Sequence, residues 1–127
     1  MTDFTITNLA GLDDVAPRFG LGDVQEARFA TKPLGAEQLG LAHVRMQPDQ
    51  TPPFTHHHGE QEELYLVLAG SGWVVLDGEE YDVRALDVVR VAAAVERGFR
   101  SGPDGLEFVA FGAPAVSGGI NDAVMPS

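Results

Sequence analysis

Short apolar segments separated by glycine and proline run through this 127-residue chain and restrict what it can fold into. The chain contains 15 Gly and 8 Pro, and the runs between them are rich in Val, Leu and Phe. This pattern favours an all-β sandwich or barrel. The expected strands are residues 27–31, 38–47, 62–69, 72–76, 80–84, 87–91, 98–101 and 106–112.

Local signals predict how some of these strands connect. Asp77–Gly78, between two apolar runs, predicts a tight hairpin turn, and Gly70–Gly72 predicts a three-residue loop between two further strands. A short helix is expected over Leu12–Phe19, where an aspartate can cap the first turn and Pro17 limits the length.

Both ends of the chain are expected to be peripheral. Phe4 and Ile6 alternate with threonines in a β-like pattern, so the first residues add a strand to a sheet edge or reach across to a second subunit. The tail over 113–127 is small and weakly apolar, and we expect a frayed terminus rather than a functional lid.

Composition excludes several classes of function. The chain has no cysteine, which leaves His, Asp and Glu as the strong metal ligands and excludes disulfides and thiol nucleophiles. With 19 acidic and 8 basic side chains its formal net charge is −11, so nucleic acid is not an expected partner. No segment resembles a leader or a membrane span, so we expect a cytoplasmic protein that does not associate with membranes.

The strongest chemical signal is a run of three histidines followed closely by carboxylates and then by an apolar strand. In an extended segment His56 and His58 point to one side and His57 to the other. Two imidazoles and one carboxylate form a metal site that leaves open positions for water or substrate. Glu62 and Glu63 must face opposite sides, and periodicity alone does not decide which of them faces the interior.

The stretch from Pro53 to Gly70, PFTHHHGEQEELYLVLAG, resembles the first conserved motif of the cupins. That motif reads His-x-His, three or four residues, Glu, six residues, Gly. His56, His58, Glu63 and Gly70 match it. The resemblance implies that Glu63 is the inward-facing ligand.

The resemblance also implies a fold. We expect a cupin-type double-stranded β-helix, which is a jelly-roll β-barrel, in a single domain with a short N-terminal helix. The barrel is expected over 38–112, with an N-terminal extension over 1–37 whose helix and strand pack on it, and a tail over 113–127. Small cupins commonly pair, so a homodimer is implied, and the outward side chains of Leu64, Leu66 and Leu68 suit its interface.

The second cupin motif is eroded in this chain. Its Gly, Pro, Gly, His and Asn positions fall on Leu86, Ala92, Ala94, Arg97 and Ser101. Arg97 replaces the histidine that the family uses as a fourth ligand, and a guanidinium cannot be a ligand. Either Arg97 turns away from the site, or the site holds no divalent cation, or an anion lies between the two charges.

Three functions follow from these patterns. The leading one is a metal-binding cupin in which His56, His58 and Glu63 hold a divalent ion (Fe, Mn, Ni or Zn) that a small organic substrate reaches. The alternative is a metal-free cupin that binds a small ligand without catalysis, and the third is an interaction protein that uses the barrel as a scaffold. Candidate substrate-binding residues are Arg97, Tyr65, which shares the face of Glu63, and His43 on the preceding strand.

Overall fold

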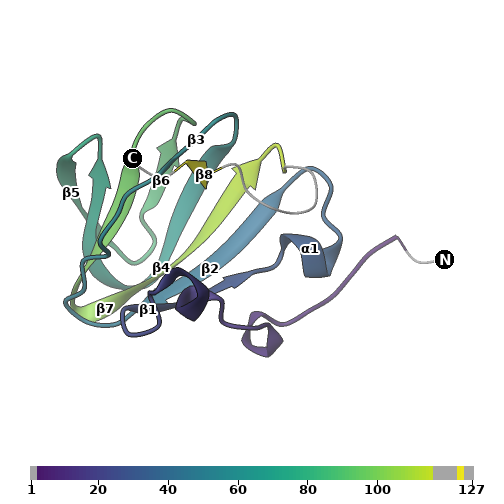
Figure 1. Ribbon diagram of the computed structural model, residues 1–127, viewed down its shortest axis with the longest axis horizontal. Helices are drawn as coiled ribbons and strands as arrows, with labels where there is room; N and C mark the ends of the chain where they lie inside the picture. The colour runs from purple at the N-terminus through teal and green to yellow at the C-terminus, as the bar shows by residue number, and fades with distance from the viewer. Residues whose placement is uncertain (1–2, 116–122, 125–127) are drawn as a thin grey trace.

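The protein is an antiparallel β-barrel with short helices in the N-terminal part of the chain (Figure 1). The computed structural model describes residues 3–115 and 123–124. The helices are η1 (Leu9–Gly11), η2 (Ala16–Phe19) and α1 (Thr31–Leu34). The strands are β1 (Gln25–Phe29), β2 (Gly40–Met46), β3 (His57–His58), β4 (Glu62–Leu76), β5 (Glu79–Arg84), β6 (Val88–Val91), β7 (Arg97–Ala113) and β8 (Ala123–Val124).

Two long strands, β4 and β7, belong to both walls of the barrel. The main sheet has the order β1-β2-β7-β4-β5, and β6 also pairs with β4. The first half of β4 pairs with the second half of β7 and with β6, whereas its second half pairs with the first half of β7 and with β5. The expected all-β barrel fold is therefore confirmed.

The corner between the two walls lies at glycines. The register of β4 against β7 shifts between Val67 and Ala69 and again between Gly70 and Gly72. Gly70 has φ 79°, and a Cβ atom built on it would lie 2.1 Å from the carbonyl oxygen of Gly105. The predicted loop at Gly70–Gly72 is wrong, because this segment is a bend inside one continuous strand.

The expected break between 98–101 and 106–112 is likewise wrong, because both segments belong to β7. The turn at Asp77–Gly78 is confirmed. Its φ angles are 49° and 87°, as a primed hairpin turn requires, and it joins β4 to β5.

The helix expected over Leu12–Phe19 forms only from Ala16, as the short 3₁₀ helix η2. Asp14 explains the difference, because its carboxylate accepts hydrogen bonds from the backbone N–H groups of Ala16 and Ala27. These bonds fix residues before η2 to strand β1 in a non-helical conformation. The helix α1 was not predicted by the sequence pattern.

The ends of the chain differ from each other. Residues 3–8 form no strand, and Phe4 and Ile6 are largely exposed. The tail expected to be frayed lies mostly outside the described residues, but Ala123–Val124 form β8 and pair with the histidine strand β3. The prediction of a frayed end is therefore wrong for these two residues. No described helix is long and apolar enough to cross a membrane.

Replacing Gly70 with alanine is expected to destabilise the barrel by more than about 2 kcal/mol, because the new Cβ would overlap the backbone of β7 at a left-handed φ. Denaturant unfolding measures the loss. Gly11→Ala is the matched control, since nothing lies within 4 Å of its Cβ position. Equal stability of the two variants would show that the corner does not depend on close backbone approach.

Candidate metal site

The histidine segment is fixed to the start of β7 by backbone hydrogen bonds. The N–H of His56 donates to the carbonyl of Arg97 at 2.9 Å, and the N–H of Arg97 donates back at 2.7 Å. The N–H of His58 donates to the carbonyl of Ala93 at 2.8 Å. These bonds hold the segment extended, so alternate imidazoles point in the same direction.

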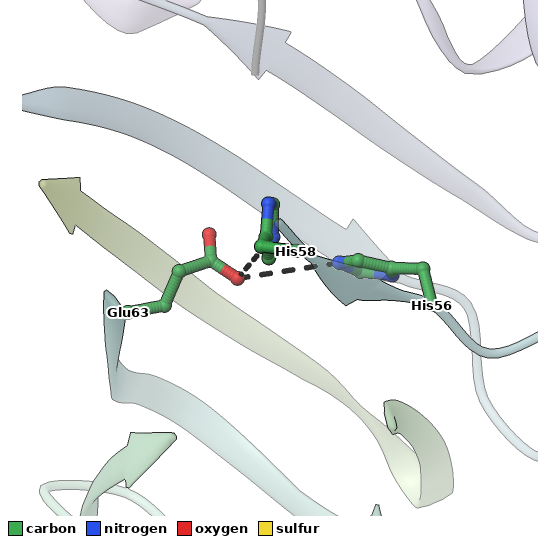
Figure 2. Close-up of side chains that lie close together, drawn as sticks. All are labelled: His56, His58 and Glu63. Carbon is green, nitrogen blue, oxygen red and sulfur yellow. Dashed lines mark hydrogen bonds and ion pairs between the residues drawn. The ribbon is translucent and has the colours of Figure 1, made fainter. Parts of the chain in front are cut away.

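The three predicted ligands lie together. One donor atom from each of His56, His58 and Glu63 falls within 4.8 Å of the others. Figure 2 shows both imidazoles directed toward one carboxylate oxygen of Glu63, whose Oε1 lies 2.9 Å from Nε2 of His58 and 4.0 Å from Nε2 of His56. Glu63 is the inward carboxylate, whereas Glu62 pairs with the exposed Arg90 at 2.6 Å.

Arg97 turns toward this site rather than away from it. Its guanidinium is fully buried, and Nη1 donates to Oε1 of Glu63 at 2.9 Å. Nε donates to the carbonyl of Val95 at 2.9 Å, and Nη2 donates to those of Ala92 and Ala93 at 2.6 and 3.3 Å. Each of the three guanidinium nitrogens therefore has a protein acceptor.

Tyr65 lies on the same face of β4 as Glu63 and donates its hydroxyl hydrogen to Oε1 of Glu63. Burial raises the pKa of Tyr65 well above its ordinary value, and the charge of Glu63 raises it further, so Tyr65 stays protonated. The same carboxylate oxygen accepts hydrogen bonds from Tyr65 and Arg97 and contacts His58.

Two of the three ligand groups, Glu63 and His56, have the protonation states that metal binding needs. Burial raises the pKa of Glu63, but hydrogen bonds from His58 and Tyr65 and the charges of His58 and Arg97 outweigh it, so the pKa is lowered and the carboxylate is ionised. Burial lowers the pKa of His56 to about 4, which leaves its imidazole neutral at neutral pH.

This donor set can hold a metal ion. Two imidazoles and a carboxylate suit Fe, Mn, Ni or Zn. Binding would require Nε2 of His58 to give up the proton it shares with Glu63, since a metal takes the lone pair of that nitrogen. Arg97 raises the electrostatic cost of binding a metal ion, because its positive charge already balances the negative charge of Glu63.

The structure does not bring His43 to this cluster. His43 lies on the opposite face of β2 from Val44 and Met46, which belong to the core or pack against it. Its Nε2 lies 2.6 Å from Oε2 of Glu107. A role for His43 in lining the pocket stays a prediction without a contact to support it.

Two features near the site had little signal in the sequence. Strand β8 pairs with the histidine strand, with Val124 opposite His57 and Ala123 opposite His58. A two-residue strand is too short to be recognised from alternation. His57, the outward histidine, contacts Glu96 at 2.9 Å, which accounts for its position outside the ligand set.

Known proteins resemble this chain in sequence and in fold. A protein-family model described as a cupin domain matches residues 42–111. A dimethylsulfoniopropionate lyase of Ruegeria pomeroyi, DddW, is 35% identical over 75 residues. That match covers 59% of this chain, and the chain spans 43% of the length of the lyase.

Solved structures show the same fold at lower sequence identity. A cupin protein from Bacteroides fragilis has a TM-score of 0.72 at 22% identity, covering 92% of this chain and 89% of the other. The polyketide cyclase RemF from Streptomyces resistomycificus has a TM-score of 0.72 at 22% identity, covering 89% and 80%. The residues that the family model matches include strands of both walls of the barrel. The chain therefore belongs to the cupin domain family.

Proposed function

We propose that His56, His58 and Glu63 hold a divalent metal ion and that a small organic anion binds at the open positions of that ion. The observation that supports the metal ion is that three donor atoms lie within 4.8 Å of one another, two of them from histidines. A bound metal of this kind supplies a Lewis acid that polarises an oxygen of its ligand. Tyr65, protonated beside Glu63, supplies a hydroxyl group at the same site.

The charge balance of the site supports an anionic ligand. Glu63 contributes one negative charge and Arg97 one positive charge, so these two groups together are neutral. A divalent ion would leave two uncompensated positive charges in a buried site. At roughly 6 Å and an effective dielectric near 20, the repulsion between such an ion and a guanidinium is roughly 5 kcal/mol. A carboxylate ligand would offset much of this cost.

Two other observations bear on the choice of ligand. The related lyase DddW is named for dimethylsulfoniopropionate, whose name denotes a carboxylate together with a sulfonium group. Arg97 directs its nitrogens at protein acceptors, so we assign it to positioning Glu63 rather than to a direct contact with the ligand.

A metal-free binding protein is the second candidate. The observation that favours it is that the Glu63 carboxylate has hydrogen-bond partners without a metal, since Tyr65, Arg97 and His58 all contact its Oε1. In that case the buried pair of Glu63 and Arg97 is a structural element of the barrel interior. Metal content separates the two candidates.

Protein purified without a nickel column is expected to contain about one divalent ion per chain by elemental analysis, because the three donors converge. His56→Ala and His58→Ala should lose the metal, and His57→Ala, which removes the neighbouring outward histidine, should keep it. A parent protein that stays metal-free after incubation with Fe, Mn, Ni and Zn salts would leave the second candidate in place.

Metal-loaded protein is expected to bind propionate at least about tenfold more tightly than its uncharged analogue propionamide, since only the carboxylate compensates the site charge. Calorimetry with metal-loaded and metal-free protein measures this. The preference should shrink in Arg97→Gln, which removes one positive charge. If protein with full metal content binds the two compounds equally, the proposal of an anionic ligand is wrong and the proposal of a metal ion stands.

The metal-free protein is expected to lose stability as the pH falls from about 6.5 toward 4. The unfolded chain protonates His56 near its ordinary pKa of 6.5, whereas the folded chain does so only near pH 4. The unfolded state therefore binds more protons in this window, at a cost of up to roughly 3 kcal/mol. Denaturant unfolding should show a weaker pH dependence for His56→Gln, and the wild-type dependence for His57→Gln. Parallel curves for the wild type and His56→Gln would contradict the depressed pKa.

A further inference from the structure

Strand β5 forms a free edge of one wall of the barrel. It lies at the end of the order β1-β2-β7-β4-β5, and in the part of the chain that the structure describes it pairs on one side only, with the second half of β4. Figure 1 shows it at the outer left of the ribbon. All of its residues except Val83 are exposed. An exposed edge strand presents backbone groups with which another strand can pair.

The hairpin turn at Asp77–Gly78 decides which backbone groups of β5 are unpaired. In a two-residue hairpin the residues that flank the turn, here Leu76 and Glu79, exchange both hydrogen bonds. The direction of the backbone groups alternates along an antiparallel strand, so Glu80 and Asp82 direct their N–H and C=O groups away from β4. These two residues therefore offer two donors and two acceptors at the edge.

The unpaired edge ends at Arg84. The N–H of Arg84 donates to Oδ2 of Asp87 at 2.9 Å, and its carbonyl accepts a hydrogen bond from the N–H of Asp87 at 3.0 Å. Asp87 thus occupies the groups that Arg84 would otherwise direct outward. The edge that remains open spans residues 80–82.

A hollow of about 450 Å³ lies beside this edge, and its lining includes Trp73, Asp82 and Arg84. Trp73 is directly opposite Asp82 on the neighbouring strand, so their side chains share one face of the sheet. Val83 points into the core, which places Asp82 and Arg84 on the outer face. A strand added to β5 would extend the row of Trp73 and Asp82, and a long side chain opposite Asp82 can reach the hollow.

Trp73 already accepts a cation on its ring. The guanidinium carbon of Arg100 lies 3.7 Å from the ring centroid, and Glu80 holds this guanidinium through two hydrogen bonds of 2.8 and 2.9 Å. Glu80 therefore balances the charge of Arg100. Trp73 lines the hollow and Arg100 does not, so part of the indole faces the hollow. Indole is the side-chain ring that binds cations best, and this part of it can receive a second positive group.

The charges of the edge favour a basic partner. Strand β5 carries three acidic residues and one basic residue, and Asp87 adds a further carboxylate to the lining of the hollow. Like charges directly opposite each other destabilise paired strands, so the acidic side chains protect β5 from pairing with a second copy of itself. A segment with Lys or Arg at alternate positions is complementary to β5, and the net charge of −11 favours its approach.

We propose that β5 binds an extended basic segment of another protein, which adds a strand along residues 80–82 and places a Lys or Arg side chain in the hollow beside Trp73. The backbone hydrogen bonds supply affinity, and the hollow supplies the preference for a basic side chain. Binding does not depend on the metal ion, because Glu63 lies in the first half of β4 and β5 pairs with the second half.

Tryptophan fluorescence tests the proposal, because Trp73 is the single tryptophan of the chain. A short synthetic peptide of alternating lysine and threonine should change the emission to saturation, and the matching peptide of glutamate and threonine should not. The lysine peptide methylated on every backbone nitrogen keeps its charge but has no N–H donors, so we expect it to bind roughly tenfold more weakly. Equal binding of the methylated and unmethylated peptides, or no response to the lysine peptide, would overturn the proposal.

Two variants locate the binding at the edge. Asp82→Lys should weaken binding of the lysine peptide roughly tenfold, because it reverses the charge at the centre of the added strand. Glu37→Lys changes the net charge by the same amount at an exposed position after α1 and should bind the peptide like the wild type. If Asp82→Lys fails to fold, Asp82→Asn should give a smaller loss in the same direction. Equal weakening by the Asp82 and Glu37 variants would show a general charge effect and contradict a site on β5.

Discussion

The buried ion pair between Glu63 and Arg97 is the interaction on which both the barrel and its candidate site depend. It joins the beginnings of β4 and β7, the two strands shared by both walls, and Arg97 also holds the carbonyls that precede β7. Removing one partner of such a pair would leave an unpaired buried charge, which costs about 3–5 kcal/mol. The same carboxylate is the candidate metal ligand, so stability and metal chemistry act on one group.

Strand β4 presents different side chains on its two faces. Glu63 and Tyr65 point into the barrel, toward the histidines, and Leu64 and Leu66 point outward. Because side chains alternate along a strand, the candidate metal site and these outward leucines lie on opposite faces of one sheet. A change of register in β4 would therefore disturb both at once.

The erosion of the second cupin motif changes the charge of the candidate site, although the barrel fold is kept. Arg97 occupies the position where the family has a histidine ligand, and its charge replaces a neutral donor with a cation. Ser101, at the position of the family's Asn, is buried and bonds the Gln47 carbonyl at 2.6 Å, so it is a structural residue of the barrel. The fold alone does not determine the activity. The paired charges of Glu63 and Arg97 are a property of this site that the fold does not set.

The sequence by itself determined the features that depend on neighbouring residues. Strand alternation placed His56 and His58 on one side, and Asp77–Gly78 gave its hairpin because both effects are local. The choice of Glu63 over Glu62 needed the family spacing. Only the tertiary structure decided that Gly70 bends a strand, that Arg97 turns inward and that β8 reaches the histidines. Each of these depends on groups distant in sequence, such as the carbonyl of Gly105 or the carboxylate of Glu63, which no local pattern encodes.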